Sequence, residues 1–438
     1  MKKRRSTILI SAGLCFALIT SAMFGALSAE AKDNDTALVT PALSVIAEDC
    51  GMAMAGLIGN SIEFDTDDFA RALNVSKMGD IEITQAPPVG AGELRVGKTV
   101  VNSGMTVSAA NLKYLTYTPA NTSTATSTFR FRPVNAGYDM PCQLYMLSSM
   151  NYAPTLDKVP ETYLQVSTHK GITMYGTLPC YDPDGDGTVI EIVKYPQSGY
   201  LELTDKTTGE YKYTPVAGYS GKDSFIYVAR DMYGNYSASE KVSLRVKKSS
   251  VNVSFDDMAG DPAYNAALTM VEEGIMSGVK VGSGNYFYPT GVVSRGDFLV
   301  MCMQAIGIEE VTGATSTSFA DDADIPLHMK GYVATAQKLG YVSGIPTESG
   351  VCFCPDQTIT RAEAAVMLGN MVELSTPEVI PTFADSDDIP VWAATSVYSL
   401  GAIGVMNTKG GVVTPMDTLT RADAAMMLTS LMRYMDIK

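Results

Sequence analysis

The chain has 438 residues, of which 46% are hydrophobic and 18% are charged, and its formal net charge is −15. This length predicts two to four globular domains. The acidic balance argues against a general binder of nucleic acid or of anionic membranes, because both ligands are themselves negatively charged.

The first 31 residues have the three parts of a secretory signal peptide. Four basic residues precede a long apolar core, and Ala29, Glu30 and Ala31 follow it as a small-residue cleavage site. Retention as a membrane anchor is the alternative, but small residues dilute the apolar core, and no later segment is apolar enough to span a bilayer. Removal of residues 1–31 takes away four positive charges and Glu30, so the mature chain has a net charge of about −18. No membrane contact is expected after this cleavage.

Six cysteines remain after residue 31, an even number that permits disulfides in an exported chain without fixing their connectivity. Cys50 and Cys142 bracket one module and are the first candidate pair. Cys352 and Cys354 lie too close along a strand to pair comfortably with each other. No cysteine or histidine spacing resembles a zinc site.

Short alternating strands separated by turn residues predict two antiparallel β-sandwich modules, at 45–158 and 159–247. The segment 81–96, "IEITQAPPVGAGELRV", is echoed by "IEIVKYPQSGYLEL" at 190–203. The segment "GKTVVNSGMTVSAANLKYLTYTP" resembles repeats of bacterial cadherin-like or immunoglobulin-like surface domains. That resemblance implies an Ig-like fold for both modules.

The acidic run "YDPDGDGTVIEIV" in the second module raises the question of calcium. Asp182, Asp184 and Asp186 match the first, third and fifth positions of an EF-hand loop, but Val193 stands where the loop needs Glu, and a β pattern follows. Two readings stay open: a Ca²⁺ site like those of cadherin-like modules, and a solvated turn between two strands. No other cofactor is expected.

Beyond a polar linker the period becomes helical, and one unit is repeated three times, at 253–312, 317–376 and 381–436. Each copy opens with "SFDD", "SFAD" or "TFAD", runs into an amphipathic helix, and turns at a proline. Six residues after that proline stands an arginine, and a second apolar helix closes the copy. Landmarks in fixed order, repeated three times, predict a repeat architecture.

The second helix of each copy begins with a capping pattern. Thr360 with Glu363 is a capping box, and Ser294 and Thr420 each have an Asp three residues later. The arginine at the first helical position is unusual, because the positive end of the helix dipole disfavours a cation. It either pairs with the early Asp of a neighbouring copy or points, together with helix N–H groups, at an anionic ligand such as an acidic saccharide.

The stretches "TFADSDDIPVWAATSVYSLGAIGVMN" and "FCPDQTITRAEAAVML" resemble the S-layer homology (SLH) domain, over about residues 253–436. The resemblance implies an all-α, pseudo-threefold trimer of motifs whose clefts bind pyruvylated secondary cell-wall polymer. It also implies the polymer-binding residues, in order of expectation: Arg361, Arg421, Arg295, Asp257, Asp321, Asp385 and Trp392. The family tryptophan is replaced by Pro262 and His328 in the first two copies, so unequal clefts are expected.

These features together predict a non-enzymatic, exported surface protein anchored to secondary cell-wall polymer or peptidoglycan. The β modules would serve as spacer, S-layer or adhesive region, with self-assembly into an S-layer left open. An SLH-tethered extracellular enzyme and a Ca²⁺-dependent adhesin are the alternatives.

Overall fold

The computed structural model describes residues 51–374, 377, 380–406, 408 and 410–437, in two compact units that are treated separately below. Unit 1 contains the chain up to Leu156 with Cys180–Tyr195 and Phe225–Glu240, and unit 2 contains the remainder. The expected signal peptide and Cys50 lie outside the described residues, so cleavage and the Cys50–Cys142 pair stay predictions. Among the described residues no two cysteines form a disulfide with each other, and Cys180, Cys302, Cys352 and Cys354 are free thiols.

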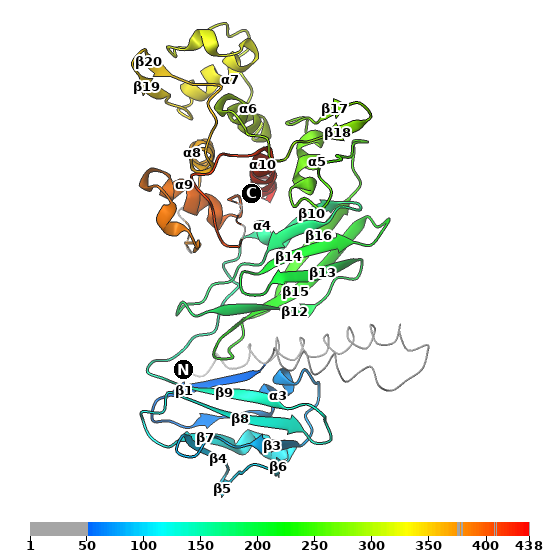
Figure 1. Cartoon of the computed structure of the whole chain (residues 1–438), viewed down its shortest axis with the longest axis vertical. Coiled ribbons are helices and arrows are strands. Elements are labelled where there is room, and N and C mark those ends of the chain that lie inside the picture. Colours follow the sequence, from blue (N-terminus) through cyan, green and yellow to red (C-terminus); the bar gives the residue numbers. More distant parts are fainter. Residues whose placement is uncertain (1–50, 375–376, 378–379, 407, 409, 438) are drawn as a thin grey trace. The chain divides into compact units, whose positions relative to one another are not determined.

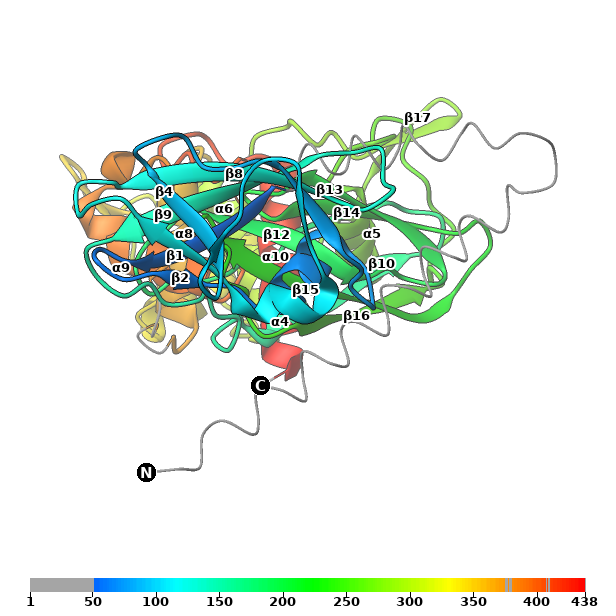
Figure 2. The same cartoon turned by 90° about the horizontal axis from the view of Figure 1, so that it is seen from below.

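Two sheets share one core in unit 1, with strand orders β1-β9-β8-β3-β6 and β2-β7-β4-β5 (Figure 1 and Figure 2). Side chains alternate between buried and half-buried along β9, as expected where one face of a sheet packs on a core. The strands are β1 (Met52–Leu57), β2 (Ile62–Glu63), β3 (Ile81–Gln85), β4 (Gly92–Val96), β5 (Thr99–Val100), β6 (Met105–Val107), β7 (Leu115–Pro119), β8 (Thr126–Pro133) and β9 (Met140–Leu147).

The expectation of purely antiparallel sheets is wrong at the first strand of each module. β1 runs parallel to β9, with Met52 opposite Cys142. In unit 2, β10 (Gln165–His169) runs parallel to β16 (Glu240–Lys247). Parallel neighbours need a long connection between them, and here nearly a whole module provides it.

The β region also contains helices that strand periodicity did not predict. In unit 1, α3 (Thr66–Ala72) is closed by a capping box between Asp65 and Asp68, and the 3-10 helix η1 spans Ala109–Tyr114. In unit 2, α4 (Glu161–Leu164) precedes β10. The remaining strands of the β region are β11 (Met174–Thr177), β12 (Thr188–Lys194), β13 (Gly199–Asp205), β14 (Glu210–Pro215) and β15 (Gly221–Asp231).

The three predicted copies lie in unit 2, and in the first two a β-hairpin separates two helices (Figure 1). The hairpins correct the all-α expectation. The first copy has α5 (Tyr264–Glu272), β17 (Val279–Val281), β18 (Gly284–Tyr286) and α6 (Arg295–Ala305). The second has η2 (Asp322–Asp324), α7 (Leu327–Lys338), β19 (Ile345–Thr347), β20 (Gly350–Cys352) and α8 (Arg361–Met371), and the third has η3 (Ser386–Asp388), α9 (Val391–Ala402) and α10 (Arg421–Ile437).

Backbone hydrogen bonds join the three copies in a closed cycle. The amide of Val293 donates to the carbonyl of Leu419 (3.0 Å), that of Leu419 to Ile359 (2.8 Å), and that of Ile359 to Val293 (3.4 Å). Each residue comes from a different copy, two positions before the arginine of its second helix. One hydrophobic core of unit 2 takes buried residues from all three copies, so they pack as one body.

Within unit 2, a buried histidine joins strand β10 to helix α5. The side-chain nitrogen of Asn265 donates to Ser167, and its oxygen accepts from the backbone amide of His169 and faces the ring Nδ1 at 2.8 Å. The ring Nε2 lies 3.0 Å from a carboxylate oxygen of Glu272. Both ring nitrogens therefore face oxygen atoms of α5, which join this helix to β10.

Candidate functional site

The capping predictions at the second helices are confirmed. Thr360 and Glu363 form a full capping box, in which the hydroxyl accepts from the Glu363 amide and the carboxylate accepts from the Thr360 amide. Ser294 caps α6 through the amide of Asp297. These contacts fix where each helix begins and hence where its arginine side chain starts.

The early aspartates hold a turn inside their own copies. Asp257, Asp321 and Asp385 each accept hydrogen bonds from two successive backbone amides, at 2.7–3.0 Å. The second amide of each pair belongs to a residue with a left-handed backbone: Tyr288 (φ 56°), Cys354 (φ 59°) and Thr414 (φ 46°). The carboxylates thus stabilise a strained turn just before the proline, and their expected contact with the polymer stays a prediction.

Each of the three arginines donates hydrogen bonds to a neighbouring copy, and the pattern is the same in all three copies. The Nε of Arg295 donates to the carbonyl of Phe353 (3.1 Å), that of Arg361 to Val413 (2.7 Å), and that of Arg421 to Phe287 (2.8 Å). The backbone amides of these arginines also donate to neighbouring copies: to Gln357, Asp417 and Gly291. The helix N–H groups are therefore engaged by protein carbonyls, and the expectation that they point at a ligand is wrong.

Arg361, expected first among the polymer-binding residues, is the least accessible of the three. Its side chain is 6% exposed, and its Nη1 lies 2.5 Å from a carboxylate oxygen of Asp423. The pairing with a neighbouring copy's acid, expected for the early Asp, is made instead by the capping Asp423 of the third copy. The Arg361 side chain therefore contributes mainly to the stability of the fold.

Arg421 and Arg295 are only partly buried, in contrast to Arg361. Arg421 donates from Nη2 to the carbonyl of Ser277 (2.7 Å), and its guanidinium lies over the Phe287 ring, 4.6 Å from the centroid. Burial lowers the pKa of Arg421 and of Arg295, while Asp297 and Glu363 respectively act in the opposite direction. Among the described residues, Arg361 forms an ion pair with Asp423, whereas Arg421 and Arg295 form none.

Arg421 lines a cavity of about 260 Å³ between helical copies, called here the Arg421 cavity. Asp297 and His328 also line it, so one acid and one imidazole accompany the guanidinium. The other lining residues are Ile275, Met276, Ser277, Val292, Val293, Val300, Met301 and Met329. A charged group set among apolar side chains suits an anionic ligand that also has carbon surface.

Trp392 lies in the first turn of α9 with 57% of its surface exposed, so it does not belong to the core. The preceding Val391 is 93% exposed. His328 holds the equivalent exposed position on α7. The indole is thus placed where a ligand could reach it.

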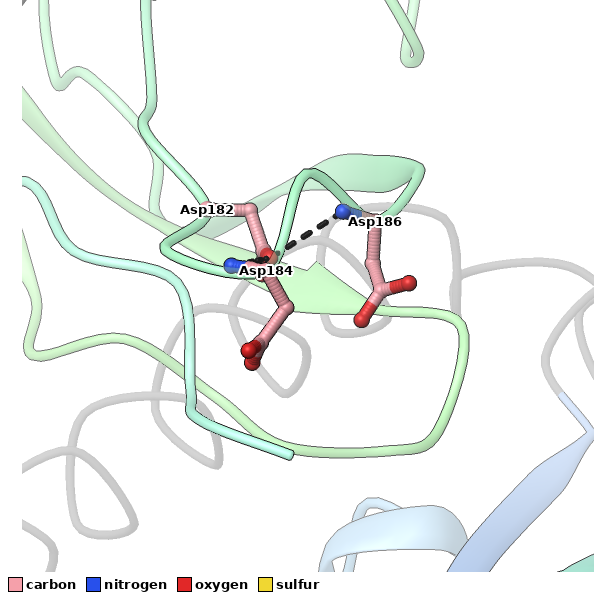
Figure 3. A group of neighbouring side chains, drawn as sticks. All are labelled: Asp182, Asp184 and Asp186. Carbon is pink, nitrogen blue, oxygen red and sulfur yellow. Dashed lines mark hydrogen bonds between the residues drawn. The ribbon is translucent and has the colours of Figure 1, made fainter. Parts of the chain in front are cut away.

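The aspartates of the second module come together in one loop of unit 1 (Figure 3). Asp182 is buried, and one of its oxygens accepts from the amides of Asp184 (3.0 Å) and Asp186 (3.1 Å). Burial raises the pKa of Asp186, and so do the neighbouring charges of Asp182, Asp184 and Asp231. The EF-hand comparison fails here as expected, because β12 follows the loop.

Comparison with protein families matches two kinds of domain. Residues 151–245 match the bacterial Ig domain. Residues 254–299 and 321–365 match the S-layer homology domain. The third copy lies outside these matches, although it repeats the same aspartate, turn and arginine.

Two curated relatives share part of the chain. "Exoglucanase XynX" of Acetivibrio thermocellus is 32% identical over 137 residues, which cover 30% of this chain and 12% of the relative. "Amylopullulanase" of Thermoanaerobacterium thermosulfurigenes is 32% identical over 138 residues, which cover 30% and 7%. The chain therefore spans only a small part of either relative's length.

Solved structures give only distant likenesses. The fibronectin(III)-like modules of Clostridium thermocellum CbhA are 14% identical with a TM-score of 0.22, covering 47% of this chain and 94% of theirs. Drosophila N-cadherin EC1-3 is 15% identical with a TM-score of 0.21, covering 40% and 56%. Such low scores carry no argument about the fold.

No helix within the described ranges has the length and apolar character that crossing a membrane requires. The chain carries a bacterial Ig domain followed by S-layer homology domains, which indicate attachment at the cell wall or cell surface.

Proposed function

We propose that this is an exported surface protein whose helical copies form a pseudo-threefold anchor that binds an anionic, pyruvylated secondary cell-wall polysaccharide without a covalent bond. The β modules then act as a spacer, an S-layer or an adhesive region. The observation that carries the proposal is the Arg421 cavity, which is lined by residues of all three copies and by the partly buried Arg421.

The guanidinium of Arg421 has donors left for a ligand. An arginine side chain carries five N–H bonds, and the bonds to Phe287 and Ser277 engage its Nε and Nη2. Hydrogen bonds to a carboxylate are charge-assisted and well matched to this planar group. The net charge of about −18 after removal of residues 1–31 opposes binding little, because salt screens charges beyond about 8 Å.

Arg295 holds the equivalent position in the first copy. Glu363 stands to Arg295 as Asp297 stands to Arg421, since each is a nearby acid whose charge opposes the lowering of the arginine's pKa by burial. In the repeat order Trp392 takes the place of His328, and its exposed indole face is the surface that we assign to a sugar ring. We therefore rank Arg421 and Arg295 above Arg361.

Peptidoglycan is the alternative ligand, and a tethered enzyme is the alternative class. Both curated relatives have enzyme names, but the match covers 12% and 7% of their lengths, so their activities are not carried over. The proposal assigns no catalytic step to the described residues. Self-assembly into an S-layer stays a prediction, which electron microscopy of the purified protein would check.

The test is co-sedimentation of the full-length chain with purified cell-wall sacculi, before and after removal of their secondary polymer. We expect binding only to untreated walls, and a drop on the order of tenfold for Arg421→Ala, because a charge-assisted hydrogen bond contributes about 1.5–3 kcal/mol. Arg245→Ala is the matched control, an exposed arginine on β16 away from the cavity.

Stability distinguishes the structural arginine from the binding one. Arg361→Ala leaves Asp423 without its partner and should lower the free energy of unfolding by about 3 kcal/mol. Arg421→Ala should lower it by only about 1–2 kcal/mol, measured by urea denaturation. Undiminished binding of the Arg421 and Arg295 alanine variants, or equal binding to stripped walls, would contradict the proposal.

A further inference from the structure

The loop at residues 182–186 holds a carboxylate oxygen that has no partner. Asp182 is 8% exposed, and its Oδ2 is buried without a hydrogen bond, whereas its Oδ1 accepts from two backbone amides. Burying an unpaired carboxylate oxygen is costly, and native proteins nearly always give such an atom a partner. The position of this oxygen therefore points to a bound species.

The other two carboxylates of the loop lie close to that of Asp182. Asp182, Asp184 and Asp186 each offer one oxygen, and these atoms all lie within 4.8 Å of one another (Figure 3). The two amide bonds to its Oδ1 fix the orientation of the Asp182 carboxylate. A water molecule would satisfy one or two of these oxygens but would leave three negative charges side by side.

The donor set selects the kind of ion. Three carboxylates, with neither imidazole nor thiolate in the group, favour a hard cation such as Ca²⁺ or Mg²⁺ over zinc. Ca²⁺ takes six to eight oxygen ligands, several of them carboxylates, whereas Mg²⁺ is usually held by one or two carboxylates and keeps several waters. A group of three carboxylates therefore favours Ca²⁺.

We propose that Asp182, Asp184 and Asp186 bind one Ca²⁺ ion, which fixes the 182–186 loop to the segment that follows β9. The site is independent of the wall-binding clefts. The loop already contacts that segment, because Asp184 accepts from the amide of Tyr152 (2.7 Å).

A second contact ties the same segment to the end of β15. The side chain of Asn151 donates to Asp231 (2.6 Å), a fully buried residue whose carboxylate also accepts from the amides of Tyr233 and Asn235. All of these residues belong to unit 1. Bound Ca²⁺ would therefore order three segments of unit 1 that are distant in the sequence.

The experiment is isothermal titration of the chelator-treated, full-length protein with CaCl₂, paired with thermal unfolding. We expect one Ca²⁺ per chain and a Ca²⁺-dependent rise in Tm, because a ligand that binds only the folded state stabilises it. Asp186→Asn and Asp184→Asn should bind at least about tenfold more weakly, since affinity follows the number of charged ligands. The Asp184→Asn side chain keeps an oxygen that can accept from the Tyr152 amide, so this variant should still fold.

Asp205→Asn is the matched control, because the Asp205 carboxylate also accepts from two backbone amides in a turn, outside the acidic group. It should bind Ca²⁺ like the wild type. The proposal is overturned if the wild type gives neither heat nor a Tm shift up to about 10 mM Ca²⁺, well above typical extracellular affinities. It is equally overturned if folded Asp184→Asn and Asp186→Asn bind normally, or if Mg²⁺ gives the same shift as Ca²⁺.

Discussion

An arginine at the first position of a helix ordinarily costs about 0.3–1 kcal/mol, because the free N–H groups there are positive. In this protein those groups are not free: the amides of Arg421 and Ala422 donate to Gly291 and Pro289 of another copy. The carbonyl of Phe287 then receives the side-chain Nε. The neighbouring copy thus removes the electrostatic conflict and leaves the remaining N–H bonds of the Arg421 guanidinium for the proposed ligand.

The strained turn before each proline gives a prediction for the third copy. Asp385→Ala removes the carboxylate that accepts from Val413 and Thr414, and we expect a loss of about 2–3 kcal/mol in unfolding free energy. Thr414→Gly should be neutral or stabilising by up to about 1 kcal/mol, because glycine adopts φ 46° without strain. Urea denaturation checks both, and equal effects of the two changes would show that the turn is not strained.

The contact between His169 and Glu272 gives a pH prediction. Burial alone would raise the pKa of Glu272, but hydrogen bonds from Ser249, His169 and Ser250 outweigh it and lower the pKa to about 2. The folded-state pKa is below the unfolded value, so this stabilisation is present above about pH 4.5 and is lost as the pH falls toward 2.

The Glu272→Gln variant should therefore lose less stability than the wild type as the pH falls from 4.5 to 2, measured as Tm against pH. Glu273→Gln, a change at the exposed neighbouring position, should leave the wild-type curve intact. Identical curves for all three proteins would mean that Glu272 does not contribute to acid sensitivity.

At the level of residues, the sequence predicted what depends on neighbours along the chain. The caps at Ser294, Thr360 and Thr420 follow from a three-residue spacing, and the structure has them. It could not predict that Asp423 would form an ion pair with Arg361, because the two residues are 62 positions apart and belong to different copies. The left-handed turn residues carry no shared residue type, so their pattern was not visible either.

At the level of elements, the echoed stretches 81–96 and 190–203 correctly marked strand, turn and strand. In both echoes the two strands belong to different sheets: β3 and β4 in one case, β12 and β13 in the other. Turn residues indicate that the chain reverses direction between two strands. Which strand each of them pairs with depends on other strands that are distant in the sequence. The parallel pairing of β1 with β9 was unpredictable for the same reason.

At the level of the whole molecule, the backbone cycle through Val293, Ile359 and Leu419 predicts that the helical copies fold together. Ending the chain at residue 380 removes the third copy, leaves the Val293 amide and the Ile359 carbonyl without partners, and exposes core shared with the first two copies. We expect the remaining two copies to lose their helical circular-dichroism signal.

The control is the full-length chain, in which calorimetry should show a single transition for the helical copies. A shortened chain whose first two copies melt at the wild-type temperature would show that each copy is stable without the cycle.

The crossing arginines also bear on engineering and on evolution. The Arg421 cavity combines the guanidinium of the third copy with carbonyls of the first copy and with lining residues of the first and second copies. Exchanging a single copy for one from a different wall-binding protein would therefore alter two recognition surfaces at once. New polysaccharide preferences should arise through matched changes in adjacent copies, and grafting experiments should transplant all three together.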